Sequence, residues 1–277
     1  PIAGQTGLAG HTNVQGEAQK ALDVISNDIV LNHIRRNPEI SILVSEELDE
    51  AVHIQNQGRF MVATDPLDGS SNLDVNGVVG TIFSVLPAAG GLLQPGSAQL
   101  AAGYAVFGPA TALVLSFGSS TVVFTLDDDG QYLLTNDNVR VPEATSEYAI
   151  NAARERFWDA ATRGYVAENV AGETGAAGKR YNMRWVGSMV ADIHRILMRG
   201  GVFMYPLDSE TTSKGGRLRL LYEANPMAML MEAAGGRSTT GRGGIRDVVP
   251  SSIHQRVPVM TGSAAEIARI EAWYAKS

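Results

Sequence analysis

Two aspartates three residues apart are the side chains in this sequence best suited to metal chemistry. Asp65 and Asp68 lie in the string DPLDGSS, where Pro66 withholds a backbone donor and Gly69 permits a tight turn. Both carboxylates can therefore face one cavity and hold a cation. Because no histidine or cysteine lies nearby, these hard oxygen ligands favour Mg²⁺ or Mn²⁺ over Zn²⁺.

The next residues, Gly69, Ser70 and Ser71, are suited to binding an anion. They can turn successive backbone N–H groups toward one phosphate, as nests and helix N-termini do. A cation and a phosphate would then lie side by side. A solvated surface turn is the competing interpretation of such a D-x-x-D-G string taken alone.

Further acids follow other apolar segments and strengthen the metal interpretation. Glu46 and Glu47 end a run that reads as a strand, and Glu223 ends another. Strand ends of a layered α/β protein converge on one crevice, so these carboxylates are expected to meet there. Gathered carboxylates repel one another unless cations lie between them. The pattern therefore predicts a phosphatase centre with several metal ions.

The net charge of −7 means that a phosphorylated ligand needs metal ions or clustered cations to hold it. Arg217 and Arg219, two apart on a predicted strand, would point the same way and bind phosphate oxygens bidentately. Exposed surface charge is the alternative interpretation of this pair. The acidic balance argues against binding to nucleic acid.

Alternating strands and helices are expected to position these residues. One long helix is predicted over residues 14–34 and carries Asp23, and others begin at Met189, at an N-capping Asn225 and at Ala264. Strands are predicted at residues 40–45, 60–64, 100–107, 112–117, 121–126, 202–205, 217–223 and 257–261. This order indicates an α/β or α+β protein with helices layered on sheets.

Composition limits the remaining possibilities. The chain has 277 residues, of which 44% are apolar, enough for one large domain or two closely packed ones. It has no cysteine, which excludes disulfides and thiolate chemistry. No apolar run reaches the roughly 18 to 20 residues that a membrane span needs. We therefore expect a cytoplasmic protein that binds no membrane.

Several segments together resemble the class I fructose-1,6-bisphosphatases, and they cover nearly the whole chain. The matching segments are VSEE (44–47), DPLDGSSN (65–72), VGTIFS (79–84), WVGSMVADIHR (185–195), RLRLLYEANPMA (217–228) and AGG (234–236). The shorter D-P-[IL]-D-G string is shared with inositol monophosphatases, whereas the longer combination is more specific.

The resemblance implies a layered αβαβα sandwich with two subdomains at residues 1–140 and 141–277, the first without the family's initial helix. It implies two or more Mg²⁺ or Mn²⁺ ions and hydrolysis of the 1-phosphate of fructose 1,6-bisphosphate by water, in gluconeogenesis or the Calvin cycle. The implied metal ligands are Glu46, Asp65, the Leu67 carbonyl, Asp68 and Glu223.

The same resemblance assigns the other site residues. Glu47 and Asp23 would prepare the water. The 1-phosphate would contact the metals, Gly69, Ser70, Ser71 and Arg219. The 6-phosphate would contact Asn151, Tyr205, Arg217 and, from a neighbouring subunit of a homodimer or homotetramer, Arg184.

Some positions depart from the family pattern. Trp185 and Arg154 stand where many members carry tyrosines on the 6-phosphate, and Glu17 stands where an aspartate is common near the metals. Arg59 and Phe60 replace a lysine-tyrosine pair often found at the AMP inhibitor site. Two alternatives stay open: a sedoheptulose-1,7-bisphosphatase or bifunctional enzyme, and a sugar-phosphate sensor without turnover.

Overall fold

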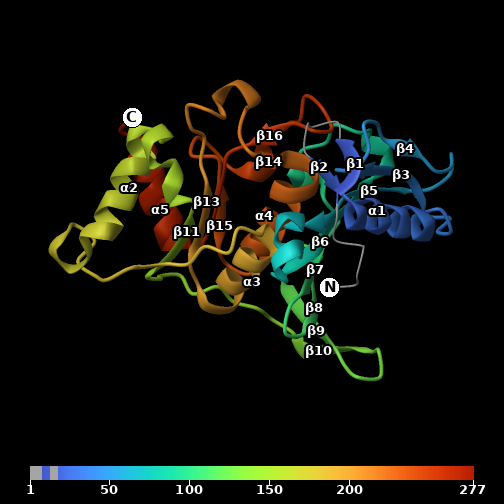
Figure 1. Cartoon of the computed structure of the whole chain (residues 1–277), viewed down its shortest axis with the longest axis horizontal. Coiled ribbons are helices and arrows are strands. Elements are labelled where there is room, and N and C mark those ends of the chain that lie inside the picture. The colour runs from blue at the N-terminus through green and yellow to red at the C-terminus, as the bar shows by residue number, and fades with distance from the viewer. Residues whose placement is uncertain (1–7, 13–17) are drawn as a thin grey trace.

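Five alternating layers of helices and sheets make up the protein in this computed structural model, which describes residues 8–12 and 18–277. Figure 1 shows α1 (Ala21–Ile34) on one side, followed by the larger sheet. Next come α3 (Met189–Arg199) and α4 (Asn225–Ala233), then the smaller sheet, and finally α2 (Ala160–Ala171) and α5 (Ala264–Tyr274). The predicted αβαβα arrangement is confirmed.

The larger sheet has eight strands, and all neighbouring pairs are antiparallel except β3 and β5. Its parallel pair places the ends of β3 and β5 at the same edge, where the acidic residues lie. In spatial order the strands are β10 (Tyr132–Asn136), β9 (Thr121–Leu126), β8 (Thr111–Ser116), β7 (Ala101–Phe107), β6 (Val79–Pro87), β5 (Phe60–Asp68), β3 (Ile40–Ser45) and β4 (Val52–His53).

The smaller sheet has five strands and mixes parallel and antiparallel pairs. In spatial order they are β12 (Asn182–Met183), β11 (Glu147–Ile150), β13 (Val202–Tyr205), β17 (Val259–Gly262) and β15 (Arg237–Thr239). Two antiparallel pairs lie apart from the sheets: β1 (Leu8–Thr12) with β2 (Ala18–Lys20), and β14 (Leu218–Arg219) with β16 (Arg256–Val257). The division of the chain at residue 140 stays a prediction.

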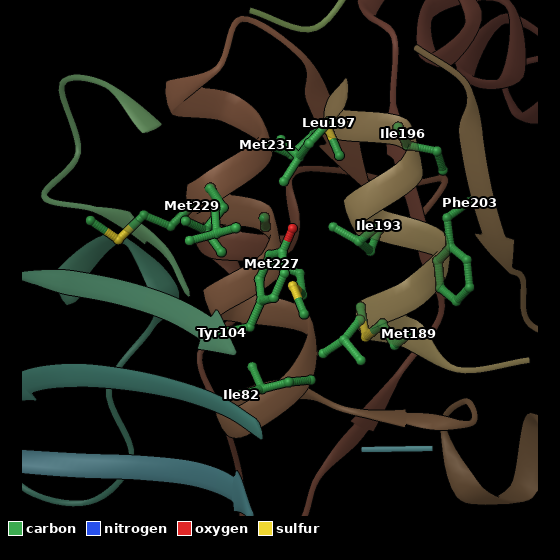
Figure 2. Packing of buried hydrophobic residues seen from close by; sticks show 14 of the residues in the cluster. Ile82, Tyr104, Met189, Ile193, Ile196, Leu197, Phe203, Met227, Met229 and Met231 are labelled. Atoms are coloured by element: carbon green, nitrogen blue, oxygen red, sulfur yellow. The ribbon is translucent and has the colours of Figure 1, made fainter. Parts of the chain in front are cut away.

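The main hydrophobic core lies between the two sheets, around α3 and α4 (Figure 2). Helix α3 packs against β6 and β7 on one side and against β13 and β17 on the other. Ile193 from α3 is fully buried there beside Met227 from α4 and Tyr104 from β7. Helix α3 therefore packs between the two sheets and contacts both.

Several predicted elements differ from the structure. Residues 18–20 form a strand rather than helix, and the helix begins at Ala21. The predicted strand 217–223 is only Leu218–Arg219, and the chain then forms a π-helical turn, Leu220–Ala224, that runs directly into α4. Asn225 is consequently inside helical structure and does not cap it. Pro258 divides the predicted strand 257–261 between β16 and β17.

We predict that Ile193→Ala destabilises the protein by about 2 to 5 kcal/mol, because it removes a buried side chain from a closely packed layer and leaves a cavity. Urea denaturation followed by circular dichroism measures the change in unfolding free energy. Ile29→Ala is the matched control, because that side chain is 54% exposed. Equal stability losses in the two variants would contradict this view of the core.

Candidate functional site

A cavity of about 450 Å³ collects most of the acids and arginines singled out in the sequence. Its wall draws on segments that are far apart along the chain. The predicted site residues that line it are Asp23, Glu46, Glu47, Asp65, Leu67, Asp68, Gly69, Ser70, Ser71, Tyr205, Arg217, Arg219 and Glu223.

The parallel strands β3 and β5 bring the first acids together. Glu46 follows β3 directly, and its backbone N–H donates to the Thr64 carbonyl of β5 at 3.1 Å. Asp65 and Asp68 lie in the last part of β5, where the pairing with β6 is irregular between these two residues. The strand was predicted to end at Thr64, but β5 continues to Asp68 with this irregular pairing. Both aspartates line the same cavity there.

Glu223 lines the same cavity but comes from a helical turn instead of a strand. It was predicted to end a strand, and this is wrong, because it lies in the π-helical turn that follows β14. The backbone N–H of Arg219 donates to its Oε2 at 2.6 Å. π-Helical turns are rare, and they are frequent at functional sites.

Three buried carboxylates form the centre of the cluster. One oxygen from each of Asp65, Asp68 and Glu223 lies within 4.8 Å of the other two. Asp68 is fixed at the start of α3, where its Oδ2 accepts from the Val190 N–H at 2.8 Å and from the Ser188 hydroxyl at 2.9 Å. The N-terminus of α3 therefore holds one member of the cluster in place.

Burial and mutual repulsion raise the pKa values of these acids. Burial raises the pKa of Asp65 well above its usual value, and the neighbouring carboxylates raise it further. Burial also raises the pKa of Glu223 to about 8, against the lowering effect of Arg219, and that of Asp68 to about 6. The cluster thus binds positive charge, in the form of protons or cations, in preference to standing fully ionised.

The donor set fits a hard divalent cation. It consists of carboxylate oxygens gathered in one buried place, and the described residues that line the cavity include neither histidine nor cysteine. Mg²⁺ and Mn²⁺ prefer such oxygen ligands, whereas Zn²⁺ prefers nitrogen and sulfur. Asp65, Asp68 and Glu223 are the clustered side chains that could hold such an ion.

Arg219 forms ion pairs with two acids of the cavity, Glu46 and Glu223, and we call this part of the cavity its acidic end. Its guanidinium lies 2.8 Å from Glu46 Oε1 and 3.9 Å from Glu223 Oε2, and its side chain is buried. Such buried pairs stay in place because breaking either one would leave an uncompensated charge. Arg219 therefore offsets part of the cluster's negative charge even before a cation binds.

Aromatic rings form another part of the wall. The Trp185 ring stacks on Phe203 at 5.8 Å between centroids, and Tyr205 meets Trp185 edge-on at 5.3 Å. The Arg217 guanidinium lies over the Tyr205 ring, 5.8 Å from its centroid. This stacked group presents a phenolic hydroxyl and an arginine to the cavity.

The loop after Asp68 is held close to α3. Gly69 has φ of 78°, and a Cβ added there would come within 2.6 Å of the Ser188 hydroxyl oxygen. Only glycine combines this left-handed conformation with so close an approach. Gly69, Ser70 and Ser71 accordingly line the cavity directly beside Asp68.

Three residues linked to the 6-phosphate do not line the cavity. The Asn151 side chain accepts from the Ala153 N–H, and Arg184 is half-exposed, 3.9 Å from Glu147. Arg154 pairs with Asp208 at 2.6 Å and with Glu210 at 3.1 Å, and it is not among the residues that line the cavity. Glu17 lies outside the described residues.

Two cationic residues of the cavity were missed in the sequence. Lys214 precedes a Gly-Gly pair and Arg217, a spacing that could have suggested a turn carrying two cations over one site. Arg256 comes from β16, directly opposite Arg219 of β14. No local pattern reveals Arg256, because only the pairing of two distant strands brings it there.

Comparisons with known proteins agree over nearly the full chain. Models of Fructose-1-6-bisphosphatase match residues 2–137 with the N-terminal domain and residues 141–275 with the C-terminal domain. Fructose-1,6-bisphosphatase class 1 from Acinetobacter baumannii strains SDF and ACICU is 50% identical over 280 residues, which cover 99% of this chain and 87% of the relative.

A solved structure shares both sequence and fold. The crystal structure of Leishmania major fructose-1,6-bisphosphatase in holo form matches with a TM-score of 0.93 and 36% identity, over 98% of this chain and 86% of that chain. Among the described residues, no helix is both long enough and apolar enough to cross a bilayer.

We predict that Asp65→Asn stabilises the protein in EDTA by about 1 kcal/mol at pH 8, because it removes one of several mutually repelling buried carboxylates. Thermal unfolding in EDTA measures this gain. With Mg²⁺ added, the wild type should gain stability and the variant should gain much less. Asp128→Asn, in an exposed turn, is the control. A destabilised Asp65→Asn in EDTA would contradict the repulsion.

Stability in EDTA should also depend on pH through Glu223. Its pKa is raised from 4.5 to about 8 on folding, so the folded state binds more protons than the unfolded state. The resulting stability is present below about pH 4.5 and is lost as pH rises toward about 8. Urea midpoints measured across this range should fall with pH in the wild type and fall less in Glu223→Gln. Identical slopes would exclude Glu223 as the cause.

Proposed function

Because the chain belongs to the class 1 fructose-1,6-bisphosphatase family, we propose that it hydrolyses fructose 1,6-bisphosphate to fructose 6-phosphate and phosphate. The observation that supports this most strongly is the buried cluster of Asp65, Asp68 and Glu223, which shares a cavity with Gly69 to Ser71 and Arg217. Such a site offers cation ligands and separate phosphate contacts. This combination suits a metal-dependent phosphatase, as members of the family are.

The proposed metal ligands are Glu46, Asp65, the Leu67 carbonyl, Asp68 and Glu223, holding two or more Mg²⁺ ions. When bound, the ions would neutralise phosphoryl charge and make hydroxide available from water near neutral pH. The Val190 N–H and the Ser188 hydroxyl keep Asp68 oriented for this role. Mn²⁺ is the expected substitute, because it accepts the same oxygen ligands.

We assign the attacking water to Glu47 and Asp23. Glu47 follows β3 and is half-buried, while Asp23 enters the cavity from the first turn of α1. Glu47 would take the proton as the water oxygen bonds to the 1-phosphorus, with Asp23 relaying it. The bond between phosphorus and the C1 oxygen then breaks, and that oxygen takes a proton as the sugar leaves.

Substrate contacts divide between the two phosphates. The 1-phosphate would contact the backbone at Gly69, Ser70 and Ser71 and the guanidinium of Arg219. The 6-phosphate would contact Tyr205 and Arg217, which already lie together. Asn151 of the same chain would also contact the 6-phosphate, although it does not line the cavity. Arg184 would reach that phosphate from a neighbouring subunit of a homo-oligomer.

Phosphate release from fructose 1,6-bisphosphate, with and without Mg²⁺, tests the function. The wild type should require Mg²⁺, and Asp68→Asn should lose nearly all turnover, because it weakens cation binding at the centre of the cluster. Sedoheptulose 1,7-bisphosphate, assayed in parallel, defines the range of sugars accepted. Metal-independent release by the wild type, or full activity of Asp68→Asn, would refute the proposed centre.

We predict that Glu47→Gln lowers kcat by about 10² to 10⁴, because the amide cannot accept the proton from water. Glu50→Gln is the matched control, being an exposed glutamate three residues away. Mg²⁺ binding, measured by calorimetry, should change little in Glu47→Gln, since the central cluster stays intact. Wild-type turnover in this variant would remove Glu47 from the proton-transfer role.

A further inference from the structure

A braced loop carries Lys214 to the rim of the cavity. Asp208 is buried, and its Oδ1 accepts from the Thr211 N–H and from the Thr211 hydroxyl, both at 2.9 Å. The Lys214 N–H then donates to the Thr211 carbonyl at 3.0 Å. A continuous series of hydrogen bonds thus runs from Asp208 to the backbone of Lys214, so this backbone has a defined position.

An ion pair with Arg154 holds the Asp208 carboxylate in place. Its Nε lies 2.6 Å from Asp208 Oδ2, and this pairing holds the pKa of Asp208 below its usual value despite the burial that raises it. Both carboxylate oxygens of Asp208 are therefore occupied, one by Arg154 and one by Thr211. The arginine braces the loop rather than binding substrate itself.

Two glycines return the chain to the cavity wall after Lys214. Gly215 has φ of 78° and Gly216 has φ of 142°. A Cβ on Gly216 would lie 2.3 Å from the Val257 carbonyl carbon, so the loop can pack against β16 only with glycine there. Arg217 follows at once, and this tight turn places Lys214 and Arg217 on the same cavity.

The cationic side chains of the cavity differ in their interaction partners. Arg219 is buried against Glu46 and Glu223, and Arg217 lies over the Tyr205 ring. Among the described residues, 8–12 and 18–277, the exposed Lys214 ammonium has neither an ion-pair nor a hydrogen-bond partner. A lysine held at an anion-binding cavity without a carboxylate partner is available to a ligand phosphate.

The position of Lys214 indicates which phosphate it meets. A second cavity of about 580 Å³ adjoins the first and shares with it only Lys214 and Arg256. That second cavity is lined by none of the clustered acids. Lys214 therefore lies where the two cavities meet, three residues before Arg217, and the second cavity that it also lines contains none of the clustered acids.

We propose that Lys214 binds the substrate phosphate that is not cleaved and thereby selects bisphosphates over monophosphates. The proposal rests on the proposed function, since it assigns a specificity-determining residue to the same site. Lys214 acts on binding, because a flexible ammonium group beside Arg217 adds attraction to a dianion without touching the reacting atoms. Its effect should weaken as salt concentration rises.

The test compares two substrates in wild type, Lys214→Ala and Lys214→Arg. Lys214→Ala should lower kcat/KM for fructose 1,6-bisphosphate by about tenfold, mainly through KM, as expected for one charged hydrogen bond. Fructose 1-phosphate lacks the second phosphate, so its kcat/KM should change by less than about twofold. Lys214→Arg should restore most of the bisphosphate selectivity, and Lys276→Ala, over Trp273, is the matched surface control.

A binding measurement gives a second readout without turnover. Fructose 6-phosphate carries only the phosphate assigned to Lys214, and calorimetry should show about tenfold weaker binding in Lys214→Ala. Equal losses for both substrates, or unchanged fructose 6-phosphate binding, would overturn the proposal. Wild-type turnover of the bisphosphate in the same assay supports the proposed function separately, so a flat response to Lys214→Ala would count against Lys214 alone.

Discussion

Repulsion between carboxylates in one desolvated space is the constraint on which the structure depends. One carboxylate oxygen from each of the buried Asp65, Asp68 and Glu223 lies within 4.8 Å of the others. The raised pKa values of these acids reflect the unfavourable free energy of ionising them together. A fold tolerates such a cluster only if the rest of the molecule holds it together. Here the restraint comes from both sheets, from the start of α3 and from the π-helical turn before α4.

The two ends of the cavity use positive charge in different ways. At the acidic end, Arg219 is locked against Glu46 and Glu223 and offsets part of their charge. Around Tyr205, Arg217 packs over a ring, and Lys214 stands on a loop braced by Arg154 and Asp208. An acidic protein thereby gathers several cations at one cavity, although its net charge is −7.

Sequence reasoning located the layered fold and most of the cavity because the deciding signals were local. The turn after Asp65 and the acids behind a short apolar strand can be read from a few neighbouring residues. The π-helical turn could not, since Arg217 to Glu223 alternates like a strand and only packing converts it to helix. Arg256 was missed because its place follows from the pairing of β14 with β16. The ion pairs of Arg154 could not be predicted from the sequence, because its partners lie 54 and 56 residues away.

Helix α3 links the interior to the carboxylate cluster, because Asp68 accepts hydrogen bonds from Ser188 and Val190 at the start of this helix. The same helix is wedged between the sheets along its length. Any interior substitution that tilts this helix also moves an oxygen of Asp68, one of the proposed metal ligands. Substitutions far from the cavity would then weaken the binding of the metal cofactor while the protein stays folded.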